Sequence, residues 1–122
     1  MKIATGVDLI EITRFETAVN KYGIRFLERI FTTKELSQFR DNVESLAVRY
    51  AAKEAVSKAL GCGIGKVSWR EIEVLRDDRD TPVLYLHGNA VQRAILLGFQ
   101  DWSVSLSHTE KYGVAFVVVV GE

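Results

Sequence analysis

The sequence contains a single cysteine, Cys62, and a single proline, Pro82. One cysteine cannot form a disulfide within the chain, which suits a reducing compartment. Hydrophobic residues make up 48% of the chain and charged residues 26%, a balance that argues for a globular protein and against disorder. With 122 residues the chain can bury a core without disulfide or metal staples, so we expect one domain over residues 1–122.

Long apolar runs and net charge are also missing. No apolar run approaches the roughly 18 residues that a membrane-spanning helix needs, and Asp8 interrupts the N-terminal segment before a signal-like apolar core develops. The 16 basic and 16 acidic side chains balance to zero, which removes any global electrostatic reason to bind nucleic acid or an anionic membrane. We therefore expect a cytoplasmic protein that binds neither, although a local basic site is compatible with this balance.

The segment over residues 49–65 is the most informative part of the sequence. Strong helix formers dominate its first part, and the glycines in 61–65 mark where the helix must end. At about 100° per residue, apolar positions cover most of the circumference, which predicts a helix buried nearly all round. Glu54 would then be partly stripped of water. It has Lys58 one turn further on, so an ordinary ion pair between these two residues explains them as well as a functional site does.

Residues 2–10 alternate in the manner of a half-buried β-strand. Asp8 shares one face of this strand with Ala4 and Gly6, whose small size lets another group approach the carboxylate. Asp8 could instead cap a following helix, because aspartate is a favoured N-cap residue. The sequence leaves both interpretations open.

Helical spacing continues after this strand. It predicts a helix over 11–20, an interruption at Gly23 and a second short helix ending near residue 31. Thr32 and Glu35 have the spacing of a capping box for a further helix through residue 39, which is a sufficient structural explanation for Glu35. A last helix is expected over 88–98.

The second half of the chain favours strands. Short runs at 67–69, 72–75 and 83–86 have β-character, and the last two flank a turn in the manner of a hairpin. Residues 102–109 alternate apolar side chains with hydroxyls, and residues 112–120 are apolar throughout, which predicts a strand buried on both faces. The sum is an α+β fold: an N-terminal strand, a helical block, and a mainly antiparallel sheet with one further helix.

Two carboxylates stand out chemically. Asp8 and Glu54 are hard oxygen ligands, of the type and number that Mg²⁺ takes from a protein when substrate phosphates and water complete its shell. The 63–65 turn offers backbone N–H groups to phosphate oxygens, although glycine is also expected where a helix ends. Lys58 can reach the same volume, as can residues 107–109 if that strand end packs nearby, so a phosphate site built from these parts would be coherent.

An ordered set of motifs spans nearly the whole chain. It consists of Gly6-Val-Asp8 with Arg14-Phe15, Phe31-Thr-Thr-Lys-Glu35, Arg49-Tyr-Ala-Ala-Lys-Glu-Ala55, Ser57-Lys-Ala-Leu-Gly61, Gly63-Ile-Gly65 and Val104-Ser-Leu-Ser-His-Thr109. In this order the motifs resemble the holo-[acyl-carrier-protein] synthases, the short, single-domain branch of the 4′-phosphopantetheinyl transferases. The set is far more specific than any one of its members.

The resemblance implies transfer of 4′-phosphopantetheine from coenzyme A to a serine of apo acyl carrier protein, with release of adenosine 3′,5′-bisphosphate. It implies that Mg²⁺ is held by Asp8 and Glu54 and that these two residues and Lys58 are catalytic. Arg14 matches the region that docks the acidic carrier protein, and members of this branch are typically homotrimers with sites between subunits. The implied coenzyme A-binding residues are Arg49, Lys58, Gly63, Ile64, Gly65, Ser107, His108 and Thr109.

Several points stay open in the sequence. Many members have Gly-x-Pro in the hairpin where this chain has Asp80-Thr-Pro82, which puts the turn geometry in question. The general base is Glu54 directly, a metal-bound water, or Glu35 through water, and we favour Glu54 or a water that it orients. The alternatives to an enzyme are a non-catalytic oligomeric module that binds a nucleotide or coenzyme A, and a structural oligomer whose charged helix forms internal salt bridges.

Overall fold

Four α-helices and five β-strands make up the fold in the computed structural model, which describes residues 1–122. In chain order they are β1 (Lys2–Glu11), α1 (Ile12–Ile30), α2 (Thr33–Phe39), α3 (Val43–Ala59), β2 (Ile72–Arg76), β3 (Pro82–Leu86), α4 (Gly88–Leu96), β4 (Phe99–His108) and β5 (Tyr112–Gly121). A short 3₁₀ helix at Trp69–Glu71 precedes β2. The α+β fold predicted from the sequence is confirmed, and no helix combines the length and apolar character that a membrane crossing needs.

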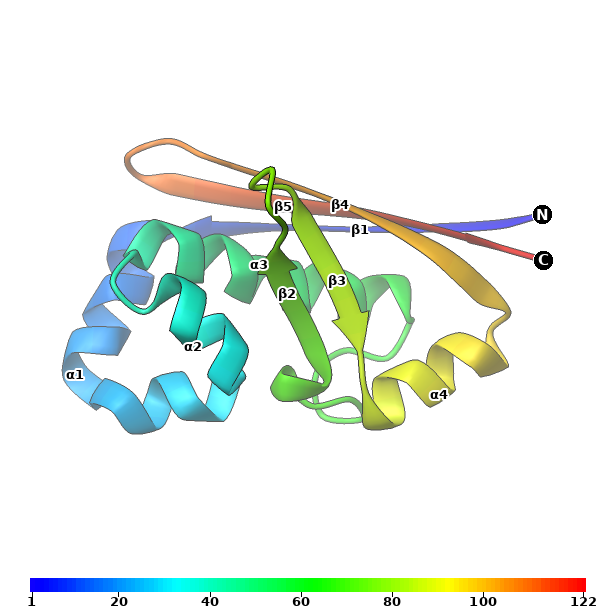
Figure 1. The fold of residues 1–122 in the computed structure, drawn as a ribbon, viewed down its shortest axis with the longest axis horizontal. Helices are drawn as coiled ribbons and strands as arrows, with labels where there is room; N and C mark the ends of the chain where they lie inside the picture. The colour runs from blue at the N-terminus through cyan, green and yellow to red at the C-terminus, as the bar shows by residue number, and fades with distance from the viewer.

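The long strands form one antiparallel sheet in the order β1-β5-β4 (Figure 1). β5 is therefore the central strand, and Ala115 on it lies opposite both Asp8 of β1 and Leu106 of β4. β2 and β3 pair only with each other, as the predicted hairpin, and β3 lies beside β4. The two chain termini lie at the same end of the sheet (Figure 1).

Helix α3 is the centre of the molecule and is buried nearly all round, as predicted. Ala47, Ala51, Ala52 and Ala55 of this helix have no exposed surface. One side of the helix packs on the sheet and another on β2. Because alanine has a short side chain, the helix backbone can come close to both layers.

The first two helices build a second hydrophobic cluster against the N-terminal half of α3. Gly23 interrupts α1 with a φ of 69°, so the element consists of two helical segments, as its position in the sequence predicts. Both hydrogen bonds of the predicted capping box between Thr32 and Glu35 are present at the start of α2. Asn42 caps α3 by accepting the backbone N–H of Ser45.

Two predictions about strands are wrong. Residues 67–69 are not a strand, because Trp69–Glu71 form a 3₁₀ turn, in which the Glu71 carboxylate accepts the backbone N–H of Ser68. The strand over 112–120 is not buried on both faces of one chain. Its odd-numbered residues pack on α3, whereas no element covers the opposite face, where Phe116 is 43% exposed.

Candidate functional site

Strand β1 lies directly against the backbone of α3, because Gly6 has no side chain. A Cβ at this position would overlap the carbonyl group of Ala55. The even-numbered residues of β1 face the helix, so Asp8 is on this side and half-buried. The small-residue face predicted beside Asp8 is therefore occupied by α3. Asp8 caps no helix, since Glu11 holds the N-cap position of α1.

Lys58, near the end of α3, reaches across to this strand. Its Nζ donates to the Asp8 carboxylate at 3.1 Å and to the carbonyl oxygen of Val7 at 2.9 Å. The Lys58 side chain is 53% exposed and that of Asp8 is 22% exposed. No ion pair joins Lys58 to Glu54, so the simple i,i+4 interpretation of these two residues is wrong.

Glu54 is the third charged residue at this site, beside Asp8 and Lys58. Burial raises the pKa of Glu54, the nearby charge of Asp8 raises it further, and Lys58 offsets part of the effect. The two carboxylates are thus close enough to repel one another. No group of three or more His, Cys, Asp or Glu side chains is arranged so that it could hold a metal ion. A pair of hard oxygen ligands with excess negative charge fits Mg²⁺ that takes its other ligands from substrate and water.

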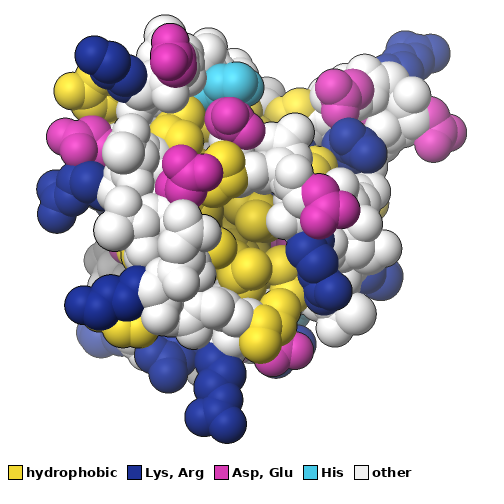
Figure 2. Space-filling view, turned by 90° about the vertical axis from the view of Figure 1, so that its left-hand side faces the viewer, with side chains coloured by type: hydrophobic (Ala, Val, Ile, Leu, Met, Phe, Trp, Pro, Cys, Tyr) yellow, Lys and Arg dark blue, Asp and Glu magenta, His cyan; other side chains and the backbone are white.

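A cleft of about 460 Å³ opens beside Asp8. Its residues come from the end of β1, helix α1, α3 and the start of β5, and they are Asp8, Leu9, Ile10, Glu11, Arg14, Phe15, Ala18, Phe26, Tyr50 and Tyr112. The surface at this end of the molecule has a hollow with a hydrophobic floor and charged side chains around its rim (Figure 2). Arg14, predicted to dock the carrier protein, therefore lines the same cleft as Asp8.

Tyr50 connects this cleft to the carboxylates, and sequence reasoning missed it. It lies one turn before Glu54 on α3, and its ring stacks on Trp69 at 4.7 Å between centroids. Burial raises the pKa of Tyr50, and the negative charges of Glu54 and Asp8 raise it further. The four-residue spacing to Glu54 was the available signal for this position.

The glycine turn after α3 differs from its prediction. The backbone N–H groups of Gly61, Cys62, Gly63 and Gly65 all donate to carbonyl oxygens of the chain, so these groups do not form a free cradle for phosphate. Gly63 and Gly65 have φ values of 71° and 129°, which is why glycine is needed there. Ile64 is half-buried against the hydrophobic core that α3 forms with the sheet and β2.

The 107–109 segment lies at the other end of α3. His108 pairs with Gly113, which packs against Val48 in the first turns of the helix. The 63–65 turn follows the end of α3, about 20 Å further along its axis at 1.5 Å per residue. One chain therefore does not bring the two segments together, so the condition that this strand end packs near the turn is not met within one chain. Ser107, His108 and Thr109 are all exposed.

Arg49 does not join the carboxylates. It precedes Glu54 by five positions, which turns it about 140° away around the helix. Its side chain is buried, donates to the carbonyl oxygens of Val74 at 3.1 Å and Ser45 at 3.4 Å, and stacks over the ring of Phe39. Burial lowers the pKa of Arg49 to about 10. These contacts give Arg49 a structural role.

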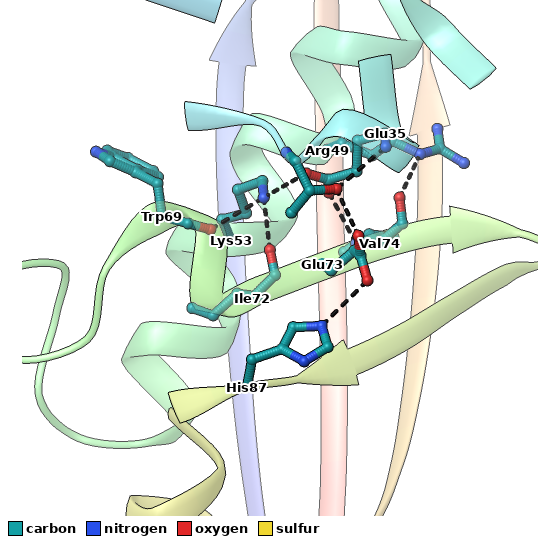
Figure 3. Close-up of polar contacts among 9 residues, drawn as sticks. Glu35, Arg49, Lys53, Trp69, Ile72, Glu73, Val74 and His87 are labelled. Carbon is teal, nitrogen blue, oxygen red and sulfur yellow. Dashed lines mark hydrogen bonds and ion pairs between the residues drawn. The ribbon is translucent and has the colours of Figure 1, made fainter. Parts of the chain in front are cut away.

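The side of α3 that carries Arg49 also carries a buried polar network, which was not predicted from the sequence (Figure 3). Lys53 and Glu35 form an ion pair at 2.8 Å, and neither side chain is exposed. Lys53 also donates to the carbonyl oxygens of Trp69 and Ile72, and Glu35 accepts the backbone N–H of Val74 at 2.8 Å. This burial rules out Glu35 as a base acting through water.

The network continues to the hairpin. Glu73 accepts from the hydroxyl of Thr32 and pairs with His87 at 3.1 Å. Burial alone would raise the pKa of Glu73, but the bonds from Thr32 and His87 outweigh it and lower the value. These contacts tie α2, β2 and the start of α4 together. The signal in the sequence was a lysine, Lys53, on a helix that was expected to be buried nearly all round.

Comparison with known proteins identifies relatives over almost the full length. The chain is 51% identical to the holo-[acyl-carrier-protein] synthase of Herpetosiphon aurantiacus, covering 98% of this chain and 99% of the relative. It is 49% identical to the enzyme of the same name from Dehalococcoides mccartyi, covering 93% of this chain and 95% of the relative.

Solved structures agree with these relatives. The Helicobacter pylori holo-[acyl-carrier-protein] synthase in complex with coenzyme A superposes with a TM-score of 0.86 at 32% identity, covering 95% of this chain and 99% of that one. The Bacillus anthracis holo-(acyl-carrier-protein) synthase, in complex with CoA (3′,5′-ADP), gives 0.78 at 37% identity, covering 98% and 96%. Residues 4–117 match the 4′-phosphopantetheinyl transferase superfamily. The chain therefore belongs to this superfamily, as an enzyme of its holo-[acyl-carrier-protein] synthase branch.

Proposed function

We propose that the chain transfers 4′-phosphopantetheine from coenzyme A to a serine of apo acyl carrier protein, with Mg²⁺ held by Asp8 and Glu54. The observation that carries this proposal is the meeting of these two carboxylates between β1 and α3. When bound, Mg²⁺ would neutralise charge on the diphosphate oxygens of coenzyme A. We further propose that the reaction takes place in the cytoplasm, within one domain formed by residues 1–122.

The protein's own residues position the reaction. The serine oxygen attacks the β-phosphorus, the bond from this phosphorus to the bridging oxygen breaks, and adenosine 3′,5′-bisphosphate leaves with the electron pair. Lys58 neutralises charge that builds on the phosphate oxygens. Glu54, or a water that it orients, takes the serine proton.

The cleft beside Asp8 is the proposed docking place of the carrier protein. Arg14 lines it, and three further exposed basic residues follow on α1, at Lys21, Arg25 and Arg29. An acidic carrier would be drawn to these charges. The KM for the carrier should therefore rise with added salt and with Arg14→Glu, while the KM for coenzyme A stays unchanged.

The complete coenzyme A site is proposed to lie between copies of the chain in a homotrimer. Within one chain the 63–65 turn and the 107–109 segment lie at opposite ends of α3. A second copy seated on the uncovered face of the sheet could supply the segment that the first copy lacks. This arrangement also gives the apolar side chains on that face a partner.

Mass spectrometry of an apo carrier protein tests the function. Incubated with this chain, coenzyme A and Mg²⁺, the carrier should gain one phosphopantetheine group as adenosine 3′,5′-bisphosphate accumulates. Asp8→Asn and Glu54→Gln should abolish the modification while the circular dichroism spectrum remains native. Glu28→Gln, which neutralises an exposed carboxylate elsewhere, is the control and should retain activity. Full activity in both site variants would contradict the proposed site.

A further inference from the structure

Lys58 already places a cation at the proposed metal site. Its ammonium group contacts the carboxylate oxygen of Asp8 at 3.1 Å and is anchored by the carbonyl of Val7 at 2.9 Å. A divalent ion that binds Asp8 must compete with this ammonium group for the carboxylate. The free site is thus occupied by a side chain of the protein itself.

The charge of Lys58 also weakens the attraction for a free ion. Two adjacent carboxylates carry a charge of about −2 when both are ionised, and the ammonium group brings the total close to −1. An incoming Mg²⁺ would meet a less negative site and a neighbouring positive charge. Binding of the free ion is therefore opposed twice, by competition for Asp8 and by repulsion.

The diphosphate of coenzyme A removes both obstacles. The Lys58 side chain is long and half-exposed, so it can turn from Asp8 to phosphate oxygens without unfolding α3. Asp8 is then released while the diphosphate brings additional oxygen ligands. Neither Lys58 nor Asp8 needs to leave the site for this exchange.

We propose that Lys58 is a specificity-determining residue that makes the site accept Mg²⁺ together with a diphosphate rather than as the free ion. This inference rests on the proposed function, since it requires Asp8 and Glu54 to bind the metal. Thermodynamic linkage then demands that Mg²⁺ raise the affinity for coenzyme A by the same factor by which coenzyme A raises the affinity for Mg²⁺.

Calorimetric titration of Mg²⁺ into the full chain tests this exchange without measuring activity. Lys58→Met should bind free Mg²⁺ about 3- to 5-fold more tightly than the wild type, the range expected when an exposed ion pair is removed. Lys66→Met removes the same charge from an exposed lysine that forms no ion pair. This control should bind Mg²⁺ with wild-type affinity.

A second set of titrations uses two ligands that differ in the diphosphate. Saturating coenzyme A should raise the Mg²⁺ affinity of the wild type by about 10-fold or more, and this gain should shrink in Lys58→Met. Adenosine 3′,5′-bisphosphate, which has no diphosphate, should leave the wild-type affinity unchanged.

These outcomes distinguish failure of the role assigned to Lys58 from failure of the proposed metal site. If Lys58→Met binds free Mg²⁺ no more tightly than Lys66→Met, the role assigned to Lys58 is overturned and the carboxylate site stands. If the wild type binds no Mg²⁺ even with coenzyme A present, the metal site of the proposed function is itself overturned.

Discussion

At the scale of single residues, the surroundings that suit Glu54 to its proposed role also make its ionised form unfavourable for the stability of the fold. Its carboxylate is held near that of Asp8, and both burial and this neighbour raise the pKa of Glu54. The folded protein therefore binds a proton at Glu54 more readily than the unfolded chain does. Its contribution to the free energy of unfolding falls as the pH rises from about 4.5 through the folded-state pKa.

Glu54→Gln should remove this decline with pH. At pH 7 we expect the variant to be more stable than the wild type by roughly 0.5 kcal/mol, a small value because water screens a half-exposed carboxylate. Urea denaturation between pH 4 and pH 7 measures the difference between the two proteins. Glu71 and Glu73, whose pKa values are lowered, act in the opposite direction but equally in both. Parallel curves would contradict the prediction.

The buried pair of Lys53 and Glu35 should behave quite differently from an exposed pair. Lys53→Met leaves the Glu35 charge buried without its partner, which should cost about 3–5 kcal/mol in chemical denaturation. Arg76→Met breaks the exposed pair with Asp80 and should cost less than about 1 kcal/mol. Equal losses in the two variants would show that the buried pair is not needed for stability.

How well the sequence predicted a site residue depended on how local its partners are. The capping box of Thr32 and Glu35 spans three positions, so spacing alone revealed it. The partner of Lys53 is 18 positions away on another helix, and only the packing of α2 on α3 brings them together. Asp8 and Glu54 could be predicted from the sequence, because the small side chains before Asp8 and the family motif both indicated the same site.

At the scale of elements, the turn between β2 and β3 explains a departure from the family pattern. Asp80 has a φ of 61°, the left-handed conformation that glycine adopts most easily. The chain adopts this conformation with an aspartate, at a position where the resemblance noted in the sequence leads us to expect glycine. Asp77 supports the turn by accepting the backbone N–H groups of Arg79 and Thr81.

Asp80→Gly should therefore stabilise the protein by about 0.5 kcal/mol, since relief of the left-handed strain outweighs both the lost exposed pair with Arg76 and the added freedom of the unfolded chain. Asp78→Gly in the same turn is the matched control. Residue 78 has no positive φ, so the added freedom of the unfolded chain should leave this variant less stable or unchanged. Thermal denaturation distinguishes them, and a loss of stability in Asp80→Gly would contradict the turn geometry.

Some elements could not be predicted fully, because their conformation or burial depends on contacts that no local sequence pattern contains. The helices were predictable because their apolar spacing, the capping box of α2 and the break at Gly23 are local. The 67–69 run has an apolar residue at each end, as a short strand does, yet the bond between Ser68 and Glu71 decides its conformation. The apolar character of 112–120 indicates burial, but it does not say whether one chain or several provide it.

At the scale of the whole molecule, the uncovered face of the sheet is the surface on which the proposed assembly depends. Large apolar side chains are exposed on it, at Ile3, Val7, Leu9 and Phe116. An exposed apolar patch on a sheet commonly marks an interface. This face is the surface through which we expect three copies to associate.

Phe116→Asp should dissociate the proposed trimer, because the new charge would be buried between copies. Light scattering after size exclusion should give the mass of three chains for the wild type and of one chain for the variant. Tyr85→Asp is the control, since Tyr85 is similarly exposed but lies on β3, away from this face. A wild type with the mass of one chain would contradict the proposed assembly.

The position of β5 has a consequence for synthesis on the ribosome. β1 is translated before every other element, yet its only sheet neighbour consists of residues 112–121, which are translated last. Pairing over such a long sequence separation is slow to form. The nascent chain therefore carries a first strand without its sheet partner during translation, and the sheet that supports Asp8 against α3 is completed only when β5 has emerged.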